Sequence, residues 1–126
     1  MAHILLIEDD PAVRDTFEII LNADGHNVTT AVDGRQGLAL LRSTDVDLVL
    51  TDIIMPNCDG VEVIRELRKH ADAPPVIAIS GGARTSAANY LEVAKLLGAQ
   101  QILSKPIGAM ELLRSVADVL AAQPVK

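Results

Sequence analysis

The chain has 126 residues, 49% of them hydrophobic, and a formal net charge of −6 at pH 7. This length suits one domain with a single core, and the longest apolar runs are far shorter than the roughly 18 residues needed to cross a bilayer. Insertion into a membrane is therefore not expected. Acidic and basic residues are mixed along an acidic chain, and its only aromatic side chains are Phe17 and Tyr90. Direct binding to nucleic acid is therefore not expected either.

The N-terminus and the cysteine content indicate where in the cell the chain is expected. The stretch MAHILLIEDD lacks the basic leader of a secretory signal peptide, and its short apolar run indicates a strand. Cys58 is the single cysteine, so an internal disulfide is excluded and a reducing, cytoplasmic compartment is expected. Its thiol is interpreted as an incidental exposed group. We expect one domain over residues 1–122 and a C-terminal tail over residues 123–126.

Apolar runs alternate with amphipathic stretches along the chain. The apolar runs predict five strands, at residues 3–7, 27–32, 48–51, 76–79 and 102–103. Helical spacing predicts the intervening helices, over residues 11–23, 33–42, 61–70 and 107–122, with a further helix that ends at Leu97 before Gly98. The runs ILLI, DLVL and VIAI are continuously apolar, as expected for strands buried on both faces. The sequence therefore predicts an α/β fold with a five-stranded parallel sheet and helices on both faces.

Each predicted helix carries an apolar face that should pack on the sheet. Asp10, followed by Pro11, is interpreted as the N-cap of the first helix and is therefore left out of the candidate site. The residues expected to point inward are Val13, Phe17, Ile20 and Leu21, then Leu38 and Leu41, then Val63, Ile64 and Leu67, and finally Leu113, Val116 and Leu120.

Polar side chains follow four of the predicted strands. In an open parallel sheet, ligands bind beyond the carboxyl ends of the strands, so side chains placed there are expected to converge. These side chains are Glu8 and Asp9 after the first strand, Asp52 after the third, Ser80 after the fourth, and Ser104 and Lys105 after the fifth.

This set of side chains fits the chemistry of phosphoryl transfer. Clustered carboxylates repel one another, and a hard divalent cation such as Mg²⁺, which prefers oxygen ligands, relieves that repulsion. Asp52 can then act both as a ligand and as a nucleophile, while Lys105 and Ser80 face the negative oxygens of the transferred group. No residue is placed to activate a hydroxyl substrate. The pattern therefore indicates a protein that receives a phosphoryl group on itself, rather than a turnover enzyme.

Four motifs, ILLIEDD, DLVLTDIIMPNCDG, VIAIS and LSKP, occur in this order over essentially the whole chain. In these motifs the chain resembles the receiver domains of response regulators in two-component systems, a CheY-like fold with strand order 2-1-3-4-5. The roles that the resemblance implies are phosphoacceptor for Asp52, Mg²⁺ ligands for Glu8, Asp9, Asp52 and the backbone carbonyl of Ile54, phosphoryl contact and switch for Ser80, and charge neutralisation for Lys105.

The same resemblance implies partners for the chain. The phosphoryl donor would be a phosphohistidine on a sensor histidine kinase or a histidine phosphotransfer protein. A downstream protein would bind the face formed by the fourth helix, the fifth strand and the fifth helix, and the chain itself would be a monomer or a weak dimer. In this family the peptide bond before the proline of LSKP, here Pro106, is usually cis.

Two features depart from the family pattern. Ile102 stands where many receivers carry an aromatic side chain that rotates inward as a switch, so signalling here must use another element. The interval between Ser80 and Lys105 is longer than is common, and we place the extra length in SGGARTS or at the start of the helix that follows it. Because this stretch belongs to the usual output surface, the choice of partner is expected to differ as well.

Three alternatives stand beside this reading. A phosphohydrolase of the haloacid-dehalogenase type would need a D-x-D pattern after the first strand, where this chain has Glu8, Asp9 and Asp10. A receiver-like interaction module that takes no phosphate would fit the missing aromatic side chain at Ile102. The chain can also be a segment of a longer regulator.

The histidines share no metal-ligand spacing and are interpreted as structural or solvated; they are His3, His26 and His70.

Overall fold

A computed structural model of the chain describes residues 2–53, 60–70, 72–80 and 98–122. The strands are β1 (His3–Ile7), β2 (Asn27–Ala31), β3 (Leu48–Asp52), β4 (Val76–Ser80) and β5 (Gln101–Ser104). The helices are α1 (Pro11–Ala23), α2 (Gly34–Ser43), α3 (Gly60–Arg68) and α5 (Ala109–Ala121). The further helix expected to end at Leu97 lies outside the described residues, as does the tail over residues 123–126.

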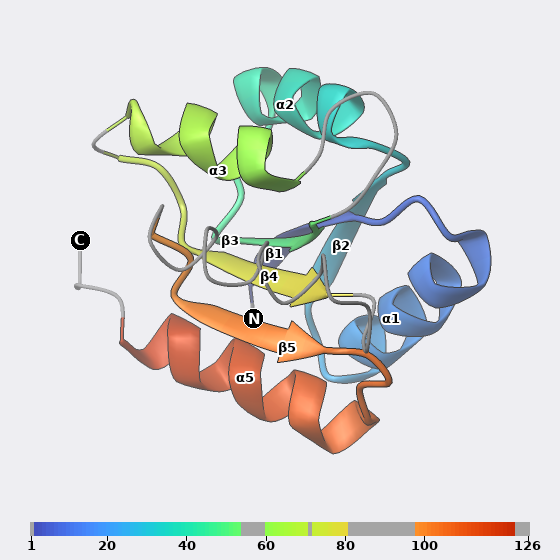
Figure 1. Cartoon of the computed structure of the whole chain (residues 1–126). Coiled ribbons are helices and arrows are strands. Elements are labelled where there is room, and N and C mark those ends of the chain that lie inside the picture. The colour runs from blue at the N-terminus through green and yellow to red at the C-terminus, as the bar shows by residue number, and fades with distance from the viewer. Residues whose placement is uncertain (1, 54–59, 71, 81–97, 123–126) are drawn as a thin grey trace.

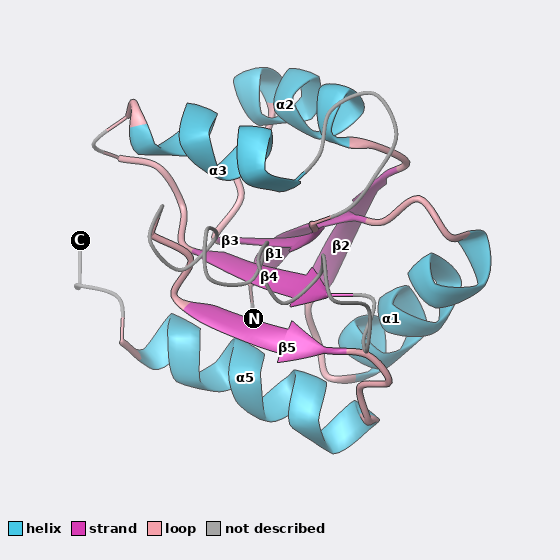
Figure 2. Ribbon diagram, in the orientation of Figure 1, coloured by secondary structure: helices cyan, strands magenta, loops and turns pink. Residues whose placement is uncertain are grey.

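The five strands form one parallel sheet in the order β2-β1-β3-β4-β5 (Figure 1). Helices α2 and α3 cover one face of the sheet, and α1 and α5 cover the other (Figure 2). The α/β fold class and the strand order are therefore confirmed. The register aligns the carboxyl ends of the central strands, because Asp52 lies opposite Ile79 and Ser80 lies opposite Ser104.

Two hydrophobic layers hold the sheet between its helices. All residues of β3 and β4 are buried, which explains why the runs LVL and VIAI within them are continuously apolar. On one face, Leu5 and Val49 pack with Ile64 of α3. On the other face, Leu6 packs with Phe17 of α1. Burying a leucine or isoleucine completely contributes about 1.5–3 kcal/mol each, so these two layers fix the strand ends in place.

The start of α1 follows the sequence expectation. Asp10 is the N-cap, and its side chain accepts hydrogen bonds from the backbone N–H groups of Ala12 at 2.9 Å and Val13 at 3.3 Å, with Pro11 in the first turn. This prediction is confirmed. Beyond the helix, Gly25 has a φ of 93°, a left-handed conformation that other residues rarely adopt.

The inward face of α5 lies one residue from the predicted stripe. Leu112, Val116 and Val119 are fully or almost fully buried, whereas Leu113 and Leu120 are only partly buried. The sequence is apolar at both residue 112 and residue 113, so periodicity alone could not choose between two adjacent faces. Among the described residues, no helix combines the length and the apolar character that crossing a bilayer requires.

Candidate phosphoacceptor site

The candidate site is built at the carboxyl ends of three strands of the sheet, β1, β3 and β5. Glu8 follows β1 directly, Asp52 is the last residue of β3, and Lys105 follows β5 directly. Backbone hydrogen bonds hold these ends together: the N–H of Lys105 donates to the carbonyl of Ser80 at 2.8 Å, and the N–H of Ile53 donates to the carbonyl of Ile79 at 2.9 Å. The sheet therefore positions side chains that are far apart in the sequence.

Three carboxylates converge at this edge of the sheet. Glu8, Asp9 and Asp52 each offer an oxygen, and these oxygens lie within 4.8 Å of one another. Glu8 is completely buried and Asp52 is 5% exposed, whereas Asp9 is exposed to solvent. Oε1 of Glu8 is buried, and the Lys105 ammonium lies 2.8 Å from it. Three carboxylates so close together repel one another, and a hard cation that prefers oxygen ligands relieves this repulsion, so the set suits Mg²⁺.

Lys105 supplies positive charge to the same cluster. Its Nζ lies 2.8 Å from Oε1 of Glu8 and 3.1 Å from Oδ2 of Asp52, and its side chain is 20% exposed. The peptide bond between Lys105 and Pro106 is cis. The lysine thus contacts two of the three carboxylates while part of its side chain stays open to solvent.

Burial and charge shift the ionisation of this pair. Burial raises the pKa of Glu8 from 4.5 to about 7; the charge of Asp52 acts in the same direction, and the Lys105 ammonium opposes it. Burial by itself lowers the pKa of Lys105, but its contacts with Glu8 and Asp52 outweigh that effect, so the net direction is upward. Lys105 therefore stays protonated near neutral pH, and Glu8 is the group whose charge the site disfavours.

Local contacts orient the carboxylate of Asp52. The N–H of Ile53 donates to Oδ1 of Asp52 at 2.8 Å, and the hydroxyl of Thr51 donates to the backbone carbonyl of Asp52 at 2.9 Å. The N–H of Gly60, the first residue of α3, donates to the carbonyl of Ile53 at 2.8 Å. One carboxylate oxygen of Asp52 is thus held by the backbone, and the other faces Lys105.

The other predicted site residues are Ser80 and Ile54, whereas Asp10 was predicted to lie outside the site. Ser80 is buried at the end of β4, beside the strand that leads to Lys105. Ile54 lies outside the described residues. Asp10 caps α1 and does not belong to the carboxylate cluster, although its N–H donates to Oε2 of Glu8 at 3.1 Å.

Two residues around the site were missed by the sequence reasoning. Nη1 of Arg14 in α1 donates to the backbone carbonyl of Glu8 at 3.0 Å, which ties the first helix to the acidic cluster. Gly60 approaches Asp52 so closely that a Cβ at this position would lie 2.8 Å from the Cα of Ile53 and closer still to the carbonyl oxygen of Asp52. The Asp-Gly step in the sequence was a signal for this second contact, whereas nothing in the sequence pointed to the first.

The fold and this edge of the sheet agree with a known family. The model of the family described as "Response regulator receiver domain" matches residues 4–117. The chain therefore belongs to the response regulator receiver domain family of two-component signalling. It is 39% identical over 119 residues to the response regulator MprA of Mycolicibacterium vanbaalenii, covering 94% of this chain and 50% of that protein. It is 35% identical over 123 residues to protein PilH of Pseudomonas aeruginosa, covering 96% of this chain and 99% of that protein.

Solved structures give the same result. The signal receiver domain of a signal transduction histidine kinase from Syntrophus aciditrophicus is 25% identical with a TM-score of 0.88, and the match covers 100% of this chain and 96% of that one. The match covers half the length of MprA, and a match over 80 residues, 64% of this chain, covers 35% of the transcriptional regulatory protein AfsQ1 of Streptomyces coelicolor. These comparisons therefore apply to the receiver portion of such proteins.

Proposed function

We propose that Asp52 accepts a phosphoryl group from a phosphohistidine and that this modification changes the surface the domain offers to a partner. The donor is a sensor histidine kinase or a histidine phosphotransfer protein. The observation that carries the proposal is the position of the Asp52 carboxylate, which is 8% exposed in its side chain and lies 3.1 Å from the Lys105 ammonium. A nucleophilic carboxylate next to a fixed cation suits attack on an anionic group.

The transfer exchanges one bond to phosphorus for another. An electron pair on a carboxylate oxygen of Asp52 forms the new P–O bond, while the P–N bond of the phosphohistidine breaks and its electron pair returns to the imidazole, which takes up a proton. Lys105 is within reach of the added negative charge, and we assign the hydroxyl of Ser80 to a phosphoryl oxygen. The chain is the acceptor in this reaction and not a turnover enzyme.

We further propose that the reaction depends on Mg²⁺. Glu8, Asp9 and Asp52 would hold the ion through their carboxylates, and the backbone carbonyl of Ile54 would complete the protein ligands. The bound ion supplies charge neutralisation and orientation of the phosphoryl oxygens. The convergence of three carboxylate oxygens within 4.8 Å supports this assignment, because a divalent cation relieves their mutual repulsion.

The output step does not use an aromatic switch. Ile102 of β5 is partly buried against the hydrophobic layer beneath α2 and α3. We assign the response to the end of β4 at Ser80 and to the face that includes β5 and α5; the fourth helix of that face lies outside the described residues. Ile102→Ala is expected to change the rate of phosphorylation little in a folded protein. A severe loss of labelling would contradict this assignment.

Location and self-association complete the proposal. The single cysteine and the absence of any expected disulfide are consistent with the cytoplasm, where a sensor kinase would present its phosphohistidine. The net charge of −6 disfavours direct contact with nucleic acid. We expect a monomer or a weak dimer.

Treatment with phosphoramidate and Mg²⁺, followed by intact mass measurement, tests the proposed function. The P–N bond of phosphoramidate resembles that of a phosphohistidine and requires no cognate kinase. We expect the unaltered chain to gain the mass of one phosphoryl group and Asp52→Asn, which preserves side-chain shape, to gain none. No gain in either protein would instead favour a receiver-like interaction module that takes no phosphate.

A further inference from the structure

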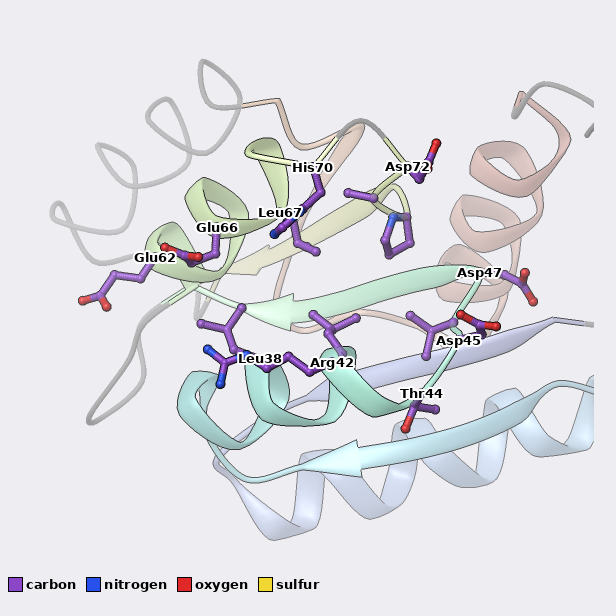
Figure 3. Close-up of a pocket in the computed structure, with 14 residues that line it drawn as sticks. Leu38, Arg42, Thr44, Asp45, Asp47, Glu62, Glu66, Leu67, His70 and Asp72 are labelled. Atoms are coloured by element: carbon purple, nitrogen blue, oxygen red, sulfur yellow. The ribbon is translucent and has the colours of Figure 1, made fainter.

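A groove lies between α2 and α3, on the face of the sheet opposite α1 and α5 (Figure 3). It has a volume of about 780 Å³, within the range of pockets that hold a ligand or several side chains of a partner. The segments that lead into β3 and β4 close one end of it. Its apolar lining consists of Leu38, Leu41, Val46, Leu67, Ala73 and Pro74.

The rim of this α2–α3 groove is strongly acidic. Figure 3 shows acidic side chains on both sides, from α3 and from the segments before β3 and β4. Two basic groups, Arg42 and His70, share the lining with them. Asp45 and Asp72 are exposed at the closed end. The acidic lining residues are Asp45, Asp47, Glu62, Glu66 and Asp72.

We propose that the α2–α3 groove docks a basic amphipathic segment of a partner protein. An apolar side chain of that segment would enter between the leucines of α2 and α3, and its lysine or arginine side chains would lie along the acidic rim. This is the helix-in-groove mode of recognition, in which apolar anchors provide affinity and complementary charges provide orientation.

Charge and spacing argue against other occupants. Among the described residues, the only group that brings three potential metal ligands together is Glu8, Asp9 and Asp52, so the rim acids are too dispersed to share one ion. Dispersed carboxylates instead match cationic groups spread along a segment. A second copy of this chain carries the same net charge of −6, and a nucleic acid or an anionic lipid surface would also be repelled.

The groove is joined to the candidate phosphoacceptor site through α3. The N–H of Gly60 binds the carbonyl of Ile53 at 2.8 Å, so the first residue of this helix is fixed next to Asp52, while Leu67 near its other end lines the groove. The groove is nevertheless separate from the carboxylate cluster. Docking there is thus expected to require neither Asp52 nor a bound cation.

Fluorescence anisotropy with three labelled helical peptides provides the test. Each peptide carries lysines and, one helical turn apart, a pair of leucines, phenylalanines or methionines. The double variant Asp45→Lys/Asp72→Lys alters the groove. Its matched control, Asp15→Lys/Asp118→Lys, makes the same charge change at exposed positions on α1 and α5, the opposite face.

We expect at least one peptide to bind the unaltered chain, and the groove variant to weaken it by about tenfold or more while the control changes its affinity by less than about twofold. Replacing the anchor residues of the peptide with serine should abolish binding. Binding by none of the three peptides, equal weakening by both variants, or full binding of the serine peptide would each overturn the proposal. Self-association of the chain that the groove variant abolishes would assign the groove to a second copy and would overturn it too.

Discussion

Nζ of Lys105 lies 3.1 Å from Oδ2 of Asp52, although the two residues are 53 positions apart in the chain. The same ammonium lies 2.8 Å from the buried Oε1 of Glu8. Lys105 therefore provides the internal positive charge that allows carboxylates to gather at the end of a hydrophobic sheet. In the proposed reaction the same positive charge faces the negative oxygens of the incoming phosphoryl group.

Removal of this charge is expected to destabilise the metal-free protein. Lys105→Met should lower the free energy of unfolding by about 1–2 kcal/mol, less than for a fully buried pair, because the lysine is partly exposed and Glu8 can take up a proton instead. Lys69→Met is the matched control, since it removes a 2.7 Å ion pair with Glu66 whose side chains are 62% and 45% exposed. That loss should be much smaller than the loss for Lys105→Met, because solvent screens an exposed ion pair. Urea unfolding measures both, and equal losses would show that burial does not set the strength of the Lys105 contacts.

The raised pKa of Glu8 predicts a pH-dependent affinity for Mg²⁺. In the metal-free fold this pKa is about 7, so below that pH Glu8 is mostly protonated, and a cation must displace the proton before the carboxylate can bind it. Affinity should therefore fall as the pH is lowered through about 7, with proton uptake by Glu8 as the cause. Calorimetry in two buffers of different ionisation enthalpy measures the affinity and the protons released. Glu8→Gln should bind more weakly with a flatter pH profile; an equally steep profile in this variant would place the titration elsewhere.

Replacing the adjacent residues Asp9 and Asp10 is expected to affect different properties of the protein. Asp10→Ala should lower the free energy of unfolding by about 1 kcal/mol through loss of the α1 cap. It should leave Mg²⁺ affinity nearly unchanged, because the contact of Asp10 with Glu8 comes from its backbone N–H. Asp9→Ala should instead abolish most of the affinity with little effect on stability, since Asp9 is exposed. Thermal unfolding and Mg²⁺ titration of both variants separate the roles, and a reversed pattern would refute the division between cap and ligand.

Gly60 is expected to be essential for the geometry around Asp52. A Cβ in Gly60→Ala would press on the backbone of Asp52 and Ile53, which cannot move aside as a flexible side chain can. We expect a loss of about 1–3 kcal/mol in unfolding free energy together with slower phosphorylation. Gly108→Ala, where a Cβ would meet no atom within 4 Å, should change stability by less than about 0.5 kcal/mol. If the two alanine variants lost the same stability, close packing at Gly60 would not be the cause of that loss.

The sequence predicted the sheet well because its strands are short, continuously apolar and separated by clear helical stretches. In a parallel sheet, strand ends lie at one edge, so the positions of Glu8, Asp52 and Lys105 in the chain were enough to place them together. The burial of Glu8 was less apparent. It follows from the packing of β1 between β2 and β3, which sequence periodicity does not reveal.

Features that depend on helix rotation or on approach between segments could not be predicted. The inward face of α5 is ambiguous in sequence because Leu112 and Leu113 are adjacent. The contact from Arg14 to the backbone of Glu8 depends on how α1 lies across the sheet. The α2–α3 groove likewise arises from the spacing between two helices, which no local pattern specifies.

Localisation of the phosphoryl group tests the central claim most directly. After treatment with phosphoramidate and Mg²⁺, borohydride reduction converts an aspartyl phosphate to homoserine, which tandem mass spectrometry of proteolytic peptides assigns to one residue. We expect homoserine at residue 52 alone, and none when Mg²⁺ is chelated. Homoserine at Asp9 or Asp10, or labelling of Asp52 that proceeds equally well without a divalent cation, would contradict the account.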